Sequence, residues 1–234
     1  RSLTLRKPKR DIDVAAVQSG LKKNTTLREL TLECWRGAAT ISPILTTLGD
    51  HPLLRKLCLI DVVDLTGLET MLQSETSRIT ELHIDRSCGS PPTRGLTRVL
   101  EALAHHPTLT KLGLRNRPLR LDQLRLLRVA LCNLSSLQTL VLTERTLGSA
   151  ELAELAPALY RNASIKMLNM SENNLDDMES AEILRDILRS NKTITTLDLS
   201  RNRFGQATGA IGCIAEGLGS NSTLMKINLS HCAL

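Results

Sequence analysis

The residues of this sequence that could bind a metal or pair as nucleophile and base are its five histidines and six cysteines. A zinc site is indicated by closely spaced ligands such as a C-x-x-C pair, and no two of the cysteines form one. His105 and His106 are adjacent, but no carboxylate or thiol stands at a supporting distance from them. Ser230 and Cys232 flank His231, but no Ser or Cys can be shown from the sequence to form a nucleophile and base arrangement with His83 or His231. We therefore expect no metal, no cofactor, no small-molecule substrate and no enzymatic activity.

The cysteines also bear on the compartment in which the protein works. Cys132 and Cys213 lie in apolar segments with helical spacing, so we interpret both as small hydrophobic residues of the core. A chain of 234 residues is long enough to fold without disulfides. Reduced cysteines and a cytoplasmic location are expected.

The net charge of +6 raises the question of nucleic acid and of membranes. Basic residues cluster at the N-terminus and between Arg115 and Arg128, but a nucleic-acid groove needs stacking aromatics, and the chain has one Trp, one Tyr and one Phe. We interpret the basic clusters as solvated surface and keep nucleic-acid binding as an alternative. No apolar run approaches the roughly 20 residues of a membrane-spanning helix, so membrane insertion is not expected.

The elements that would position these residues follow from an internal repeat, L-x-x-L-x-L-x-x-N-x-L, which is clearest at 165–175 and 194–204. Its copies start 25 to 30 residues apart, at positions 27, 54, 79, 109, 137, 165, 194 and 224. Leu3 and Leu5 match the end of an earlier copy.

Each copy combines two hydrophobic periods. Alternation of apolar and polar residues, as in TTLDLS, predicts a strand with one buried face. The segments 149–160, 178–189 and 207–218 space their apolar residues as helices do. A strand and a helix of this length cannot bury their inner faces alone, so neighbouring units must stack around one core with parallel strands.

On these motifs the chain resembles a leucine-rich repeat protein of the ribonuclease-inhibitor class, over essentially its whole length. The resemblance implies an α/β solenoid, or horseshoe, with a parallel β-sheet on the concave face and α-helices on the convex face. We expect residues 1–234 to form a single domain of about nine repeats. Because the chain starts at Arg1 and ends at Leu234 in mid-pattern, we expect it to be a fragment of a larger protein.

The ninth repeat position in this family is usually Asn or Cys, which bonds the backbone of the turn after the strand. Asn173, Asn202 and Cys232 fit this pattern. The residues that depart from it are Trp35, Val62, Ser87, Arg117 and Arg145. More irregular turns are therefore expected in the first two thirds of the chain, and residues 85–96, with two prolines and two glycines, are expected to protrude as a loop.

Six N-x-S/T sequons would ordinarily suggest glycosylation, at Asn24, Asn133, Asn162, Asn191, Asn221 and Asn228. Four of them, together with His51 and His106, stand three residues before a repeat start. We interpret that slot as a turn after each helix in which the backbone adopts a left-handed conformation.

The concave face is the remaining candidate for function. The third positions of the copies alternate in charge at Glu29, Lys56, Glu81 and Lys111, and opposite charges on adjacent strands attract by roughly 0.2–1 kcal/mol per pair. The residues that we predict to contact a partner are Asp85, Arg86, Lys111, Arg115 and Glu144. Arginines at such places form forked contacts with carboxylates.

The resemblance implies a protein-interaction module within a larger intracellular protein, where it would serve for recognition, as a scaffold or for autoinhibition. A rigid sheet offers an area adequate for an interface of roughly 800 Å² per partner. One alternative is a GTPase-activating protein resembling the activator of the Ran GTPase, in which an exposed arginine such as Arg115 would be essential. Nucleic-acid binding through the basic clusters is the other; it predicts an affinity that falls steeply with salt.

Overall fold

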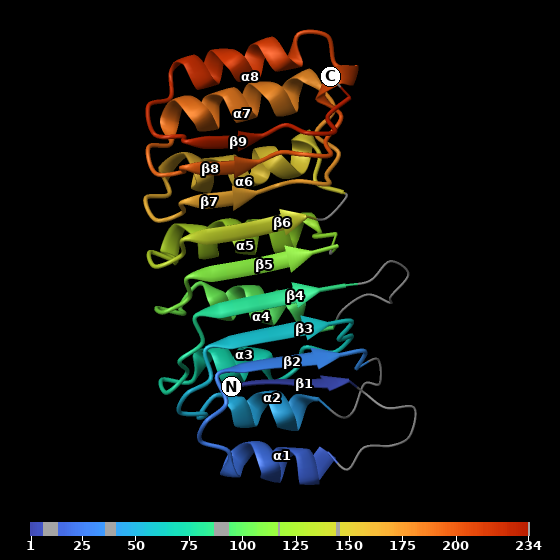
Figure 1. Cartoon of the computed structure of the whole chain (residues 1–234), viewed down its shortest axis with the longest axis vertical. Coiled ribbons are helices and arrows are strands. Elements are labelled where there is room, and N and C mark those ends of the chain that lie inside the picture. Colours follow the sequence, from blue (N-terminus) through green and yellow to red (C-terminus); the bar gives the residue numbers. More distant parts are fainter. Residues whose placement is uncertain (7–13, 36–40, 87–93, 117, 144–145, 234) are drawn as a thin grey trace. The chain divides into compact units, whose positions relative to one another are not determined.

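The computed structural model describes residues 1–6, 14–35, 41–86, 94–116, 118–143 and 146–233 (Figure 1). In these ranges nine strands alternate with helices along the chain. The strands are β1 (Ser2–Arg6), β2 (Glu29–Glu33), β3 (Lys56–Ile60), β4 (Glu81–Asp85), β5 (Lys111–Arg115), β6 (Thr139–Thr143), β7 (Met167–Asn169), β8 (Thr196–Asp198) and β9 (Lys226–Asn228). The helices are α1 (Val14–Lys23), α2 (Ser42–Leu48), α3 (Leu68–Gln73), α4 (Leu96–Leu103), α5 (Leu121–Asn133), α6 (Ser149–Arg161), α7 (Met178–Ser190), the short 3-10 helix η1 (Phe204–Gln206) and α8 (Ala210–Gly219).

The contacts divide the chain into two compact units, an N-terminal unit, Arg1–Gly113, and a C-terminal unit, Leu114–Leu234. In the N-terminal unit β1 to β4 pair in parallel, and Leu30 is in register with Leu57. In the C-terminal unit β6 to β9 do the same, and Leu168 is in register with Leu197. The register thus follows the repeat step, and within each unit the helices lie on one side of the strands (Figure 1). The α/β repeat architecture is confirmed, whereas a single domain stays a prediction.

The apolar repeat positions form the core, as predicted. Leu57 and Leu82 in the N-terminal unit and Leu140 and Leu168 in the C-terminal unit are 0% exposed. They can be buried together because parallel strands in register place the same face of each repeat toward the helices. At the free edge of β1, Leu3 has no earlier strand beside it in the described chain and is 38% exposed.

One backbone geometry recurs in the turns that follow the strands of both units. The eighth repeat position is left-handed, with φ between 51° and 59°, at Cys34, Asp61, Asn116, Glu172, Arg201 and His231. There the backbone N–H donates to the seventh-position carbonyl of the following repeat, as from Cys34 to Ile60 (2.9 Å) and from Arg201 to Ser230 (2.9 Å). Arg86, at the eighth position after β4, is not among the left-handed residues, so the departure in the described turns falls in the first two thirds of the chain, as expected. Residues 36–40 and 87–93, where more irregular turns were expected, lie outside the described residues, as does most of the predicted loop 85–96.

Behind this turn the ninth position donates a hydrogen bond to the preceding repeat. The Nδ2 of Asn202 donates to the Met170 carbonyl (3.0 Å), and the Cys232 thiol donates to the Leu199 carbonyl (3.3 Å). Trp35, which we expected to depart from the pattern, does the same with its indole: Nε1 donates to the Leu5 carbonyl (3.2 Å). A ring N–H thus supplies the donor as well as an amide does, whereas the buried Val62, at the same position of its repeat, has no side-chain donor.

The Asn slot between each helix and the next strand is a cap, but not for the reason that we predicted. Asn162 and Asn191 have extended backbones with φ of −63° and −76°, so the left-handed conformation is wrong. Their side chains instead bond in two directions. The Oδ1 of Asn191 accepts from the N–H groups of Thr193 (2.8 Å) and Ile194 (2.9 Å), and its Nδ2 donates to the Leu159 carbonyl of the preceding repeat (2.8 Å).

Histidine occupies the same slot in the N-terminal unit. The Nδ1 of His51 accepts from the backbone N–H of Leu54 (3.1 Å), and the Nε2 of His106 lies 3.4 Å from the Ser77 hydroxyl. Both rings are buried, and this burial lowers the pKa of each histidine. The predicted turn role of these histidines is confirmed.

Two helix predictions are confirmed and two details are wrong. Helices α6 and α7 match the predicted 149–160 and 178–189, but α8 begins at Ala210 rather than at 207, because Gly209 (φ 90°) has a left-handed backbone just before it. Cys213 is buried as expected. Cys132 is exposed, since the buried face of α5 runs through Leu127 and Leu131 and turns the next residue outward.

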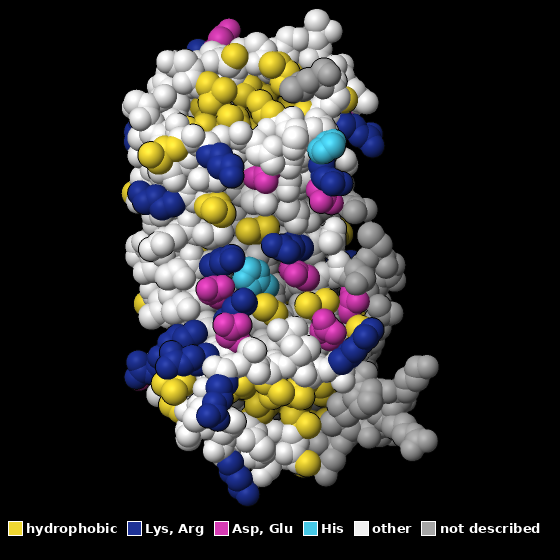
Figure 2. All heavy atoms as spheres, viewed as in Figure 1, with side chains coloured by type: hydrophobic (Ala, Val, Ile, Leu, Met, Phe, Trp, Pro, Cys, Tyr) yellow, Lys and Arg dark blue, Asp and Glu magenta, His cyan; other side chains and the backbone are white. Residues whose placement is uncertain are grey.

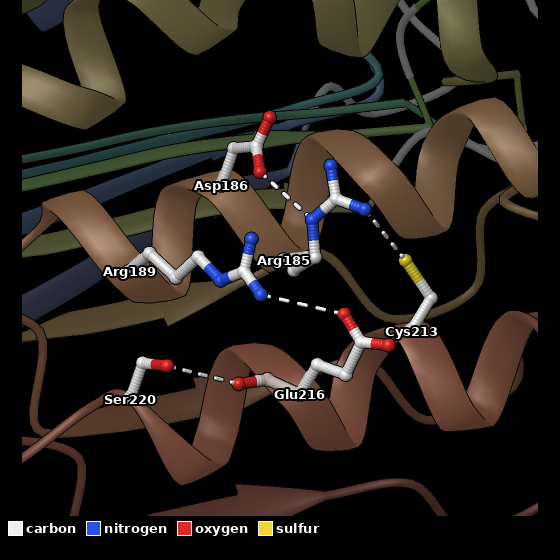
Figure 3. A network of polar contacts seen from close by, with 6 residues as sticks. All are labelled: Arg185, Asp186, Arg189, Cys213, Glu216 and Ser220. Carbon is white, nitrogen blue, oxygen red and sulfur yellow. Dashed lines mark hydrogen bonds and ion pairs between the residues drawn. The ribbon is translucent and has the colours of Figure 1, made fainter.

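The last two helices of the C-terminal unit are joined on their outer side by polar contacts (Figure 3). The Arg189 guanidinium lies 3.3 Å from the Glu216 carboxylate, and Arg185 donates to the Cys213 sulfur at 3.6 Å and to the Asp186 carboxylate at 2.9 Å. None of the helices in the described part of the chain combines the length and the apolar character needed to cross a membrane.

Candidate protein-binding surface

The side chains on the side of the strands away from the helices form what we call the strand face, which consists of the third, fifth and seventh repeat positions. In the N-terminal unit its first row is the predicted charge ladder. Lys56 Nζ lies 3.7 Å from the Glu29 carboxylate, and Lys56 is in register with Glu81 on the other side. The next member, Lys111, donates its backbone N–H to the Thr80 carbonyl beside Glu81 (3.0 Å). Alternating charges are therefore held on fixed strands, and the predicted Glu29–Lys56 pair is confirmed.

The middle row of this unit consists of Thr31, Cys58, His83 and Gly113, and none of these residues is fully exposed. His83 is 7% exposed and lies against Gly113, where a Cβ atom would come within 2.6 Å of the histidine Nδ1. The absence of a side chain at Gly113 therefore makes room for the imidazole. The His83 ring also contacts Glu81, whose carboxylate lies 3.7 Å from Nε2.

Cys58 and His83 are register partners on adjacent strands, a pairing that the sequence analysis missed. Burial is the main reason that the pKa of the Cys58 thiol is raised, and the nearby Asp85 and Glu81 carboxylates add to this effect, whereas Lys56 and a hydrogen bond with Thr31 oppose it. A nucleophilic cysteine needs the opposite shift, toward thiolate. The arrangement therefore does not activate Cys58.

The predicted contact residues are distributed over both units. Asp85 and Arg86, at the end of β4, and Lys111, at the start of β5, belong to the N-terminal unit and are half-buried. Arg115, at the end of β5, belongs to the C-terminal unit and is exposed. Glu144 lies outside the described residues. The structure thus brings Asp85, Arg86 and Lys111 onto one body.

In the C-terminal unit the strand face is less charged. Its first row is Thr139, Met167, Thr196 and Lys226, of which Met167 is 44% exposed. The fifth position carries Asn or Asp in β7 to β9, and each side chain folds back onto a serine two residues later. The Asp198 carboxylate, for example, accepts from the N–H (3.0 Å) and hydroxyl (2.7 Å) of Ser200. This local bonding competes with the strand ladder and explains why β7 to β9 are only three residues long.

Metal-binding groups do not gather on either unit: no three His, Cys, Asp or Glu side chains among the described residues are placed to hold an ion. The sequence analysis also missed Arg203 and Gln206. They line a hollow beside the turns of the last repeats, together with Glu172, Arg201 and His231. No repeat position marks Arg203 or Gln206, but the charged residues at the neighbouring eighth position, where a left-handed backbone favours Asn or Gly, were a signal for this hollow.

The sequence matches neither a protein-family model nor a curated protein. Solved structures do resemble it. Human 5T4 (Wnt-activated inhibitory factor 1, trophoblast glycoprotein) is 18% identical, with 85% of this chain and 68% of that chain covered and a TM-score of 0.57. A Bacteroides fragilis protein from structural genomics is 16% identical, with 97% and 74% covered and a TM-score of 0.53. Actin-binding site 2 of leiomodin-1 is 22% identical, with 56% and 76% covered and a TM-score of 0.50.

These neighbours are leucine-rich-repeat-like proteins with alternating strands and helices. The chain has a leucine-rich repeat fold. The identities are low, so the similarity concerns the backbone and not the residues of any binding surface. The similarity therefore gives no information on which residues of the strand face bind a partner.

Proposed function

We propose that the chain is a protein-interaction module whose strand face binds a protein partner, and that it forms one domain of a larger intracellular protein. We assign its repeats to the ribonuclease-inhibitor class, in support of which each repeat pairs one strand with one helix at steps of 25 to 30 residues. The proposed contact residues remain Asp85, Arg86, Lys111, Arg115 and Glu144.

The observation that carries this proposal is the charge ladder of the N-terminal unit. Lys56 stands between Glu29 and Glu81 on hydrogen-bonded strands, and Figure 2 shows basic and acidic side chains gathered over β2 to β5. Binding a partner there would require little ordering of the backbone, which is a main cost of association. Complementary charge would then select the partner.

Two further observations support a binding role rather than a catalytic one. The raised pKa of Cys58 keeps the thiol protonated beside His83. A leiomodin-1 structure with this fold is named as an actin-binding site, which supports protein as the class of ligand. The intracellular setting is supported by Cys232, whose free thiol fills the donor position that asparagine occupies in other repeats.

Reversal of charge on the strand face tests the proposal. The wild-type chain and the Lys111→Glu and Arg115→Glu variants would each be immobilised, and the proteins captured from the native source would be quantified by mass spectrometry. We expect a protein captured by the wild type to be reduced about tenfold with at least one variant, which corresponds to about 1.4 kcal/mol of binding free energy.

The matched control is Lys23→Glu, which makes the same charge change at an exposed position on α1. It should capture the wild-type set of proteins. The proposal fails if neither strand-face variant changes the captured set, or if Lys23→Glu reduces capture as strongly as they do.

A further inference from the structure

Beside the strand ends of the C-terminal unit lies a polar hollow of about 610 Å³, which we call the turn hollow. Its lining comes from three successive repeats, so it exists only when those repeats are stacked. The side chains that concern us are Glu172, Asn174, Arg201, Arg203, Gln206 and His231.

The floor of the hollow is rigid. Asn173 and Asn202, which also line it, are 4% and 0% exposed, and Asn202 bonds both to the Met170 and Leu199 carbonyls and to the Leu175 N–H. Phe204, which follows Arg203 in the sequence, has a fully buried side chain. The side chains that line the hollow are therefore anchored on a backbone that is already ordered.

The rim presents three charged or ionisable side chains in a row. Glu172, Arg201 and His231 occupy the same position in consecutive repeats, each with a left-handed backbone (φ 59°, 59° and 58°). The backbone N–H of Glu172 donates to the Ser200 carbonyl, and that of Arg201 donates to the Ser230 carbonyl (2.9 Å each). These bonds hold successive turns together. A left-handed backbone costs roughly 1–2 kcal/mol for residues other than Gly, Asn or Asp, so side chains of other types at such sites suggest a role for the side chain.

The charge of the hollow is unbalanced. Two guanidinium groups face one carboxylate, and among the described residues neither Arg201 nor Arg203 forms an ion pair. Both arginines and His231 are exposed, so they are available to a ligand. Figure 2 shows basic, acidic and histidine side chains close together over the ends of β8 and β9.

From these observations we propose that the turn hollow binds an extended, acidic peptide segment of a protein partner, with the arginines holding its Asp or Glu carboxylates. Arginine forms forked, charge-assisted bonds with carboxylates. Alternate side chains of an extended peptide lie roughly 7 Å apart on one face, which suits two arginines that line one hollow. The amides of Asn174 and Gln206, which also line the hollow, can bond the peptide backbone. The inference rests on the proposed function, to which it adds a second contact area.

The test measures binding of a fluorescein-labelled decapeptide in which Glu and Thr alternate and both ends are blocked. Fluorescence anisotropy at low ionic strength would compare it with the same peptide carrying Gln in place of Glu. We expect the Glu peptide to bind and the Gln peptide to bind at least about tenfold more weakly. The double variant Arg201→Glu/Arg203→Glu should weaken binding of the Glu peptide about tenfold or more.

The matched control is Arg161→Glu/Lys192→Glu, which changes the net charge equally at exposed positions of the same unit outside the hollow. Its affinity should stay within about twofold of the wild type, because unpaired surface charges this far away are screened. Glutamate already occupies the equivalent left-handed position at 172, so Arg201→Glu is expected to fold, and circular dichroism would verify this.

Several outcomes would overturn the inference. Equal binding of the Gln peptide, or an equal loss in the control variant, would remove the role of the arginines. Stronger displacement of the peptide by inorganic phosphate than by glutamate would assign the hollow to phosphate groups. If the Gln peptide binds only when its C-terminus is unblocked, the hollow recognises the terminal carboxylate of a chain and not acidic side chains. The proposed function is tested separately by Lys111→Glu, so either can fail without the other.

Discussion

Single residues in this protein supply particular hydrogen-bonding atoms, and the residue type varies as long as the atom is present. The ninth position offers a buried donor from Asn202, from the thiol of Cys232 or from the indole of Trp35. The slot before each strand offers an acceptor from Asn191 or from His51. A buried carbonyl or N–H without a partner would cost roughly 1–3 kcal/mol, which explains why these substitutes retain the bond. Val62, at the ninth position of its repeat, has no side-chain donor and is an exception.

The choice of histidine over asparagine in that slot has a consequence for stability against pH. Burial lowers the pKa of His51 and of His106 below 6.5, so the unfolded chain binds protons more readily than the folded one. Stability is therefore present above the unfolded pKa and is lost as the pH falls through it. We expect the free energy of unfolding, measured with urea, to decrease from about pH 7.5 to about pH 5.5.

The double variant His51→Asn/His106→Asn should show a smaller decrease over the same range, because asparagine caps the slot without titrating. His105→Asn is the control, since His105 is adjacent but exposed to solvent. An identical pH dependence in the wild type and the double variant would contradict the assignment.

At the scale of elements, the distance between neighbouring helices is set by small residues at the contact. Helix α8 approaches α7 at Gly217, where a Cβ atom would come within 2.9 Å of the Arg185 Cα and 3.0 Å of its carbonyl oxygen. Arg185 also contacts Cys213 of α8, and Arg189 pairs with Glu216 of α8 (Figure 3). Gly212, on the same helix, has no atom within 4 Å of such a Cβ.

We therefore expect opposite effects from the same substitution at two positions of α8. Gly217→Ala should lower the free energy of unfolding by about 2 kcal/mol, because backbone atoms of α7 cannot yield easily. Gly212→Ala should raise it by about 1 kcal/mol, since alanine favours a helix and has room there. Urea denaturation of both variants checks the pair, and equal effects would show that the contact at Gly217 is looser than the structure indicates.

At the scale of the whole molecule, the repeats of each unit are stacked as an array, so the stability of a repeat depends on how well both of its sides are covered. Leu168 and Leu197, in the interior of the C-terminal unit, are 0% and 2% exposed. Their equivalent in the last repeat, Ile227, is only half-buried, and Met225 is 87% exposed. Figure 2 shows apolar side chains exposed over this end of the C-terminal unit.

Hydrogen exchange should reveal this difference in coverage within the C-terminal unit. The amides of Met225 and Lys226 both donate to the Thr195 carbonyl (2.8 and 3.0 Å), as those of Thr195 and Thr196 do to the Lys166 carbonyl (2.9 and 3.0 Å). Despite this equal geometry, we expect the pair at 225 and 226 to exchange at least about tenfold faster, because local opening needs less apolar surface to be exposed. Equal protection at the two sites would contradict this expectation.

The sequence alone determined the repeat, its strands and most of its helices, because alternating and helical periods of leucine reflect local burial that every copy shares. It located the charge ladder from Glu29 to Lys111 for the same reason, since parallel strands in register place equal repeat positions side by side. Other features depend on contacts between residues that are about 30 positions apart in the sequence, and on the direction in which particular side chains point. The bond from Trp35 to Leu5, the place of His83 over Gly113 and the gathering of Arg201, Arg203 and His231 around one hollow are of this kind. Only the tertiary structure decided these, because no period in the sequence records which side chain fills the space that a neighbouring repeat leaves open.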